Sequence, residues 1–393
     1  MTVGEQSDGF GRLPSRRTTI DGVRVIVLDG PSGVGSLVDA LRSVLDGIGP
    51  AVLPLSAADP RFAELRERMA PDRPVEPGTA VIVATSGSTG EAKGVLLSAA
   101  ALRASAAATH ARLGGPGRWL LPLPAQHVAG VQVIARSLLA GAEPVVLGAQ
   151  AFADAADQLG SGRRYTSLVP TQLSRLLATD LEALRSFGAV LLGGAATPAP
   201  LLERARAAGV RVVTTYGMSE TAGGCVYDGF PLDGVGVRLS AGVVELSGPM
   251  LASGYRLAPA ATAASFVDGW FRTTDLGALR PDGSLEILGR ADFVINTGGV
   301  KVAPSAVEAV LTAQPGVAEA CVVDLPSVEW GQLVAAAIVP AGPAPAVADL
   351  LDAVRAALGG PAVPKLVRFA DALPQRGPGK VDRSAVRELL RTA

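Results

Sequence analysis

The segment AVIVATSGSTGEAKG, residues 80–94, decides the architecture of this chain. Its apolar first part predicts a buried strand, and the glycines and hydroxyls after it predict a loop that leads into a helix. Glycine lets backbone N–H groups converge on an anion, and hydroxyl and ammonium groups add further donors. We therefore predict a phosphate-binding loop, which is formed by Thr85, Ser86, Gly87, Ser88, Thr89, Gly90 and Lys93.

This loop differs from the Walker motif. Gly87 and Lys93 have the Walker spacing, but Ala92 stands in place of the second glycine and Gly94 in place of the serine or threonine. Taken alone, the segment has a plain alternative, a flexible surface loop with Lys93 exposed to solvent.

The residues around the loop show alternating strand and helix patterns. Residues 23–28 and 51–55 are apolar runs typical of strands, and residues 36–45 have a helical pattern with Ser36 as a candidate N-cap. This alternation predicts βαβ units and a mainly parallel sheet. Residues 98–113 are expected to form the helix behind the phosphate loop, with Ser98 as its N-cap. The helix dipole would favour phosphate only if the N-terminus points inward.

The later sequence changes character twice. Strand patterns continue to residue 192, with an apolar helix over 128–139, and residues 235–287 then show short strands with glycine-rich turns. After Arg290 a new unit of about 100 residues begins, a usual size for a domain. We expect an N-terminal domain over 1–291, with a β-subdomain at about 235–288, and a C-terminal domain over 292–393.

Composition favours small-molecule chemistry. The 393 residues carry 35 Lys and Arg against 36 Asp and Glu, so there is no strong field to attract nucleic acid or an anionic membrane. Two cysteines, Cys225 and Cys321, and two histidines, His110 and His127, suit a reducing compartment and no structural zinc site. No signal peptide or spanning helix is evident, and we expect a cytoplasmic protein without membrane insertion.

Four later motifs occur in a fixed order behind the loop. They are TYGMSET at 215–221, GWFRTTD at 269–275, GRAD at 289–292 and PGKVDR at 378–383. With these segments the chain resembles the acyl-adenylate-forming superfamily of acyl-CoA ligases, adenylation domains and luciferases, from about residue 80 to its C-terminus. The resemblance implies an α/β fold in which a large N-terminal domain of parallel-type sheets, helices and a β-subdomain precedes a small, mobile α+β C-terminal domain.

The resemblance also implies a nucleotide site for ATP and Mg²⁺. The loop would close over the β- and γ-phosphates, Tyr216 would stack on adenine, and Glu220 would hold the metal, which suits a hard carboxylate. Asp275 would accept hydrogen bonds from both ribose hydroxyls, and Arg290 would face the same ribose; alone, either could be a surface ion pair. The other nucleotide-binding residues implied are Gly194, Ala195, Thr215 and Gly217.

Two further positions match the moving parts of the superfamily. Lys380 would touch the substrate carboxylate and the α-phosphate as the adenylate forms, an electrostatic role that a turn-rich loop can present. Asp292 matches the pivot of the C-terminal domain, where backbone dihedral angles change between two states.

The second state would accept coenzyme A. Gly298 and Gly299 would then line the pantetheine channel, although Val300 and Lys301 stand where the family more often has Glu-Asn. His127 resembles the gate between this channel and the acyl pocket; the alternative is a buried structural histidine. Lys380, His127 and Glu220 are the residues expected to act in catalysis.

The substrate is indicated by resemblance. The segments SLVPTQLSRLL (167–177) and LLGGAA (191–196) resemble 2-succinylbenzoate–CoA ligases of menaquinone biosynthesis, whose acid carries a second carboxylate. Residues expected near the acid are Thr171, Gln172, Gly193, Met218 and Ser219. Two alternatives stay open: another aryl- or acyl-CoA synthetase or stand-alone adenylating enzyme, and a non-catalytic nucleotide-binding protein. A homodimer and no nucleic-acid partner are also expected.

Overall fold

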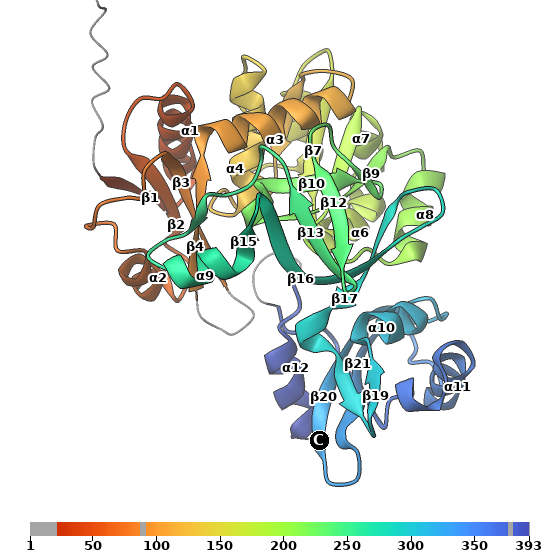
Figure 1. Ribbon diagram of the computed structural model, residues 1–393. Coiled ribbons are helices and arrows are strands. Elements are labelled where there is room, and N and C mark those ends of the chain that lie inside the picture. The colour runs from red at the N-terminus through yellow and green to blue at the C-terminus, as the bar shows by residue number, and fades with distance from the viewer. Residues whose placement is uncertain (1–21, 87–91, 376–379, 393) are drawn as a thin grey trace, which may run out of the picture.

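Four β-sheets form the protein, seen in a computed structural model that describes residues 22–86, 92–375 and 380–392 (Figure 1). The first sheet has the order β1-β2-β3-β4-β14, in which β1, β2 and β3 are parallel and β4 and β14 antiparallel to their neighbours. Its strands are β1 (Val23–Leu28), β2 (Ala51–Ser56), β3 (Thr79–Ser86), β4 (Ala92–Ser98) and β14 (Gly254–Tyr255).

The second sheet has the order β11-β10-β9-β8-β7-β5-β6. The strands from β6 to β9 are parallel, as the alternating pattern predicted, and β10 and β11 are antiparallel to their neighbours. Its strands are β5 (Arg118–Leu121), β6 (Val145–Val146), β7 (Arg164–Leu168), β8 (Ala189–Leu192), β9 (Val212–Met218), β10 (Gly223–Tyr227) and β11 (Phe230–Pro231).

Three helices fill the space between these two sheets: α1 (Pro31–Leu45), α3 (Ala99–Arg112) and α4 (Val128–Leu139) (Figure 1). Their apolar side chains and those of both sheets form one core, which includes Leu41, Leu102 and Ile134. Residues 130–137 of α4 are all buried, because this helix is covered on every side. A second core lies on the other face of the second sheet, under α5 (Phe152–Asp157), α6 (Pro170–Thr179), α7 (Leu181–Arg185) and α8 (Ala199–Ala207).

The third sheet has the order β12-β13-β16-β15. Strand β17 pairs with residues 275–279 of the long strand β16. Its strands are β12 (Gly236–Ser240), β13 (Val243–Ser247), β15 (Phe266–Val267), β16 (Trp270–Leu279) and β17 (Leu285–Arg290). Two short helices, α2 (Phe62–Met69) and α9 (Pro259–Ser265), lie near the first sheet and β15. These short strands occupy the segment where the sequence changed to strands with glycine-rich turns.

The fourth sheet follows β17 and lies apart from the other three (Figure 1). Its order is β19-β18-β21-β20, with β22 beside β21. The core under α10 and α11 lies on one face, and the core under α12 on the other. The elements are β18 (Ile295–Thr297), β19 (Val300–Val302), α10 (Pro304–Thr312), β20 (Val317–Ser327), β21 (Gly331–Pro340), α11 (Val347–Leu358), β22 (Leu366–Phe369) and α12 (Arg383–Arg391). The predicted α/β class, with a small α+β unit at the C-terminus, is confirmed.

Two local predictions were wrong. The first helix starts at Pro31, not at Ser36, because proline at the first helical position has its dihedral angle preset and lacks only an N–H that the helix does not use. The phosphate loop is followed by β4, not directly by a helix. Helix α3 begins only afterwards, where Ser98 accepts a hydrogen bond from the N–H of Ala101 at 3.0 Å, so its predicted N-cap is confirmed.

No helix in the described part of the chain is long and apolar enough to cross a membrane.

Candidate active site

Three of the predicted nucleotide-binding residues meet where the second and third sheets approach each other. Tyr216, near the end of β9, donates its hydroxyl to Asp275 Oδ2 at 2.7 Å. Asp275 lies on β16 directly opposite Arg290 of β17, and their charged atoms are 3.9 Å apart. The backbone N–H of Asp275 also donates to Thr273 Oγ1 at 3.0 Å. An aromatic ring, a carboxylate and a guanidinium therefore lie within one corner.

The charges of this corner are only partly compensated. Burial raises the pKa of Asp275, while the hydrogen bond from Tyr216 and the charges of Arg290 and Lys380 oppose the rise. Burial also raises the pKa of Tyr216, and the Asp275 carboxylate raises it further, so the phenol stays protonated as a donor. A carboxylate with few fixed partners can accept hydrogen bonds from a vicinal diol.

A second cluster forms beside the β3–β4 hairpin. Glu220, in the turn after β9, accepts a hydrogen bond at its Oε1 from the hydroxyl of Tyr255 at 2.9 Å. The ammonium of Lys93 lies 5.0 Å from the centre of the same tyrosine ring, a cation–π arrangement. Lys93 is exposed and pairs with Thr85 across the β3–β4 hairpin. The lysine of the hairpin and the carboxylate predicted to hold a metal thus contact the same tyrosine.

The loop itself is described only at its ends. Thr85 and Ser86 close β3, and the Thr85 hydroxyl donates to the carbonyl of Lys93 at 3.2 Å. The predicted loop residues Gly87, Ser88, Thr89 and Gly90 lie outside the described residues.

Two glycines of the motifs are required by close packing. A Cβ on Gly193 would lie 2.3 Å from Thr215 Oγ1, and one on Gly217 would lie 2.2 Å from the carbonyl oxygen of Gly223. Gly194 has φ +84°, which disfavours any other residue. The ends of β8 and β9 therefore present backbone rather than side chain here, and Ala195 beside them is exposed.

Lys380 belongs to the C-terminal part of the chain. It is exposed, and its charge opposes the rise in the pKa of Asp275. His127, the residue that precedes α4, has its pKa lowered by burial and then by Lys380 and Arg61, while Asp59 acts in the opposite direction. The positive charge of Lys380 therefore acts on both the corner carboxylate and the predicted gate. A Cβ on Gly130 would come within 2.4 Å of the Pro124 carbonyl oxygen, which explains the tight loop that places His127.

The predicted pivot lies between the two parts. Asp292 belongs to a short 3₁₀ turn, and Arg290 donates to both of its oxygens at 2.9 and 2.7 Å. The guanidinium groups of Arg290 and Arg383 each lie 5.1 Å from the centre of the Phe293 ring. The same arginine thus contacts the corner carboxylate and the pivot.

The predicted coenzyme A residues lie elsewhere. Gly298 and Gly299 form the turn between β18 and β19, and the Gly298 N–H donates to the Trp330 carbonyl at 2.9 Å. A Cβ on Gly298 would lie 2.7 Å from the Trp330 ring. The turn therefore packs against Trp330, while the charge of Lys380 acts on Asp275.

The residues predicted near the acid are spread over several elements. Gln172 joins the start of α6 to the end of β5: its oxygen accepts from Val169 N at 3.1 Å and its amide donates to the Pro122 carbonyl at 3.1 Å. It also lines a hollow of about 260 Å³ at the ends of β5 and β7. Thr171 is exposed, whereas Met218 and Ser219 are half-buried beside Glu220.

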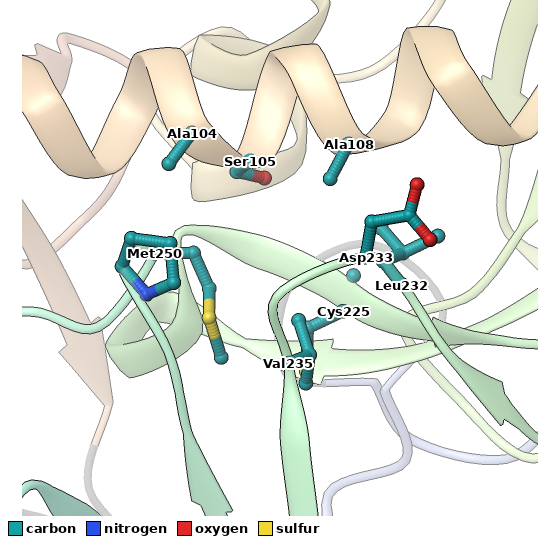
Figure 2. Close-up of a pocket in the computed structure, with 10 residues that line it drawn as sticks. Ala104, Ser105, Ala108, Cys225, Leu232, Asp233, Val235 and Met250 are labelled. Carbon is teal, nitrogen blue, oxygen red and sulfur yellow. The ribbon is translucent and has the colours of Figure 1, made fainter.

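A separate small pocket lies between α3 and the segments around β10 and residue 250 (Figure 2). Its space of about 10 Å³ holds roughly one water molecule. The Ser105 hydroxyl that lines it donates to the Ala222 carbonyl at 3.1 Å, and burial raises the pKa of the Cys225 thiol to about 12. The pocket therefore holds neither a substrate-sized space nor a reactive thiolate.

A metal ion at Glu220 would need further ligands in addition to this carboxylate. Within the described residues no group of three or more His, Cys, Asp or Glu side chains is placed to hold an ion. Glu220 keeps its Oε2 free of any hydrogen bond to Tyr255, so the site fits Mg²⁺ that is held by one carboxylate together with phosphate and water oxygens.

Sequence reasoning missed Tyr255 and Arg256. Tyr255 positions Glu220 and stacks against Lys93, and Arg256 fixes the segment behind it through Glu76 at 2.7 Å. The only local signal was the triplet Gly254-Tyr255-Arg256, because both partners are far away in the sequence.

Comparisons with known proteins define the class. The family model described as "AMP-binding enzyme" matches residues 24–249, and the one described as "AMP-binding enzyme C-terminal domain" matches residues 306–380. The chain belongs to the AMP-binding enzyme family, which is the acyl-adenylate-forming superfamily indicated by its motifs.

Within this family the chain is similar to one particular ligase. A Mycobacterium tuberculosis (strain ATCC 25618 / H37Rv) protein described as "Probable 2-succinylbenzoate--CoA ligase" is 44% identical over 377 residues, which cover 93% of this chain and 97% of that protein. The structure of o-succinylbenzoate CoA synthetase from Bacillus subtilis, in complex with the acyl-adenylate intermediate OSB-AMP, has a TM-score of 0.77 at 25% identity and covers 95% of this chain and 88% of that one. The same enzyme in complex with ATP and magnesium ion gives a TM-score of 0.70 at 28% identity over 86% and 75% of the two chains.

Proposed function

We propose that this protein is an AMP-forming ligase that joins 2-succinylbenzoate to coenzyme A, with release of AMP and pyrophosphate, in menaquinone biosynthesis. The observation that carries the proposal is the corner in which Tyr216 donates to Asp275 and Asp275 lies opposite Arg290. The charge of Lys380 acts on Asp275 and on His127, and a lysine whose charge acts on a ribose-type carboxylate suits carboxylate activation by ATP. The similarity to 2-succinylbenzoate–CoA ligases supports the choice of acid.

The nucleotide would lie in the corner of Tyr216, Asp275 and Arg290. Asp275 would accept hydrogen bonds from the ribose hydroxyls, and the Tyr216 ring would lie against adenine. The hairpin with Thr85, Ser86 and Lys93 would approach the outer phosphates. Mg²⁺ held at Glu220 would neutralise phosphate charge when bound. The backbone at Gly193, Gly194, Ala195, Thr215 and Gly217 would form the wall of this corner.

The reaction has two steps. In the first, a carboxylate oxygen of the acid attacks the α-phosphorus, the bond to the β-phosphate oxygen breaks, and pyrophosphate leaves. Lys380 stabilises the charge that develops, a preorganised contribution of about 10²–10³ in rate. In the second step the thiol of coenzyme A loses its proton and attacks the acyl carbonyl, and AMP leaves. His127 lies where it can open the path for the thiol.

The two steps require two positions of the C-terminal part. We propose a boundary at residues 291–292, with Asp292 as the pivot between an N-terminal ATP- and acyl-binding domain and a mobile C-terminal domain. The state with Lys380 at the cleft serves the first step. Rotation would bring Gly298 and Gly299 to the Asp275 corner for the second step; at present Gly298 packs against Trp330.

The composition of the chain supports a cytoplasmic enzyme that acts on small molecules. The net charge of −1 supports small-molecule substrates rather than nucleic acid. The free thiols of Cys225 and Cys321 are buried and suit the cytoplasm, where thiols stay reduced. A homodimer stays a prediction, for which sedimentation of the purified chain is the measurement.

The test is pyrophosphate release from MgATP. The acids to compare are 2-succinylbenzoate, benzoate, a medium-chain fatty acid and several aryl acids, each with and without coenzyme A. We expect selective release with 2-succinylbenzoate and a thioester only when coenzyme A is present. Pyrophosphate release with another acid only would support the ligase activity and refute 2-succinylbenzoate as the substrate. If no acid causes pyrophosphate release although ATP still binds, a non-catalytic nucleotide-binding protein would be favoured.

A further inference from the structure

Tyr255 contacts two charged groups of the predicted nucleotide site. Its side chain is buried, and its hydroxyl donates to Glu220 Oε1 at 2.9 Å. The ammonium of Lys93 lies 5.0 Å from the centre of the same ring. Glu220 is the carboxylate expected to hold Mg²⁺, and Lys93 belongs to the loop expected to close over the outer phosphates. One buried side chain therefore contacts both the expected metal ligand and the expected phosphate ligand.

The tyrosine is itself held in place by the protein. It pairs with Val95 across β14 and β4, and Lys93 lies two residues before Val95 on the same face of β4, at a diagonal position that a long side chain can reach. The N–H of Tyr255 donates to Thr262 Oγ1 at 2.9 Å. Its ring packs edge-to-face with Phe266, and the two ring centres are 5.8 Å apart. The backbone and the ring of Tyr255 are thus both fixed by neighbouring residues.

The segment around Tyr255 holds Glu220 at two points. The N–H of Ala252 donates to the carbonyl of Glu220 at 2.8 Å, three residues before the phenol that holds the carboxylate. The turn that carries Glu220 is closed by Thr221, whose hydroxyl accepts the N–H of Met218 at 2.9 Å. The main chain and the side chain of Glu220 are therefore both fixed. The bond at Oε1 leaves Oε2 available to a cation, because each carboxylate oxygen accepts independently.

The phenol of Tyr255 acts only as a hydrogen-bond donor to this carboxylate. Burial raises the pKa of Tyr255, and the Glu220 carboxylate raises it further, while Ser265 has the opposite effect. The phenol is therefore protonated at neutral pH, and its single O–H points to Glu220. Its role is orientation of the carboxylate and not proton transfer.

Tyr165 shows how a tyrosine with a structural role is bonded in this protein. It is buried in β7, and its hydroxyl lies 2.9 Å from the Leu113 carbonyl and 3.1 Å from the Gly115 carbonyl. Such backbone groups need a partner inside the protein. Glu220 is only half-buried and can be hydrated by water, so its bond to Tyr255 fixes a direction rather than satisfying a buried group. Carboxylates that bind metal ions are typically oriented by an outer hydrogen bond of this kind.

We propose that Tyr255 is a positioning residue of the MgATP site, whose hydroxyl orients Glu220 for Mg²⁺ and whose ring holds Lys93 for the outer phosphates. This inference rests on the nucleotide-binding part of the proposed function. The two roles use different parts of one side chain, the O–H group and the aromatic face. Phenylalanine at this position keeps the face and loses the O–H, whereas leucine loses both. Substitution therefore separates the two roles.

The two roles differ in expected size. Loss of an outer hydrogen-bond partner of a metal-binding carboxylate lowers metal affinity by about 10–100-fold. A cation–π contact of an exposed lysine corresponds to a smaller factor, about 2–5-fold in affinity. We therefore expect the hydroxyl of Tyr255 to govern the Mg²⁺ requirement, and its ring to make a modest contribution to the binding of ATP itself.

The experiment measures ATP binding by isothermal titration calorimetry without any acid, so that no adenylate forms. Dissociation constants are compared in EDTA and across a Mg²⁺ series. Tyr255→Phe should raise the Mg²⁺ concentration needed for half of the metal effect by about 10–100-fold, and excess Mg²⁺ should restore binding. Its affinity for metal-free ATP should stay within about twofold of wild type, whereas Tyr255→Leu should also weaken metal-free ATP by about 2–5-fold. Tyr165→Phe, which loses a buried hydroxyl in the second sheet, is the matched control and should keep both wild-type values.

A double substitution tests whether Tyr255 acts through Glu220. Glu220→Gln should raise the Mg²⁺ requirement at least as much as Tyr255→Phe does. Addition of Tyr255→Phe to Glu220→Gln should then cause no further change, because both act through one carboxylate. A wild-type Mg²⁺ requirement in Tyr255→Phe, or a full further shift in the double variant, would overturn the inference while the proposed function stands. If wild type binds no ATP with or without Mg²⁺, the proposed function and this inference both fail.

Discussion

Arg256 is the buried arginine whose loss should unfold the protein most easily. Its Nε donates to the Met69 carbonyl at 3.0 Å and its Nη1 to the Pro74 carbonyl at 2.7 Å. The guanidinium also donates to Glu76 at 2.7 Å, and Glu76 accepts the N–H of Leu257 at 2.8 Å. One side chain thus ties the end of β14 to the segment between α2 and β3.

The magnitude follows from these partners. Arg256→Met would leave several backbone carbonyls and the Glu76 carboxylate without their donor. Burial raises the pKa of Glu76, but the Leu257 N–H and Arg256 lower it more, so the carboxylate is charged and would lose its main partner. Breaking a buried pair of this kind costs about 3–5 kcal/mol. At about 2–4 °C per kcal/mol, the melting temperature should fall by roughly 10 °C.

The assay is thermal unfolding followed by circular dichroism, with Arg103→Met measured beside it. The Arg103 side chain is 44% exposed and donates to the Leu45 carbonyl at 3.1 Å, so its loss should cost about 1 kcal/mol or less. A melting temperature for Arg256→Met within about 2 °C of wild type would refute this reasoning.

Three further perturbations test the site and the core. Lys380→Ala should slow adenylate formation by about 10²–10³ and spare thioester formation from a supplied acyl-adenylate; equal loss of both half-reactions would contradict its role. Asp292→Pro should spare adenylation and impair thioester formation, because proline fixes φ at the proposed pivot; an unchanged second half-reaction would remove the pivot assignment. Burial lowers the pKa of His110 from 6.5 to about 4, so the unfolded chain takes up this proton at a higher pH than the folded chain does. The free energy of unfolding should therefore fall as the pH decreases between these two values, by up to about 3 kcal/mol. His110→Asn should show a shallower fall in urea denaturation at pH 7 and pH 4.5, and parallel profiles would contradict the low pKa.

Local patterns determined the elements that the sequence predicts well. Helix α4 has the predicted bounds, Val128–Leu139, because an apolar run of that length between two turns has no other regular form. The strands at 23–28 and 189–192 also lie where their apolar runs predicted them. The motif order, read as a resemblance, was enough to identify the family, because each motif is contiguous in the sequence.

Tertiary structure decided which of these residues meet. Tyr216 and Asp275 come from different sheets, and the sequence holds no register that would pair them. Glu220 is positioned by Tyr255, which reaches it only because β14 joins the first sheet beside β4. Such contacts depend on the order of strands in a sheet, whereas propensity and periodicity report only on neighbours along the chain.

The two buried arginines show this division most clearly. In the sequence, Arg136 and Arg256 are each one basic residue in an otherwise largely apolar segment. Only the fold gives Arg256 its carbonyls and Glu76, and only the fold places the Arg136 guanidinium beside the Trp119 ring, where no carboxylate of the described residues forms an ion pair with it. The sequence by itself therefore determined the family, the motif residues and elements such as α4. The tertiary structure decided which charges are paired, because pairing requires groups that are distant in the chain to be brought within a few ångströms of one another.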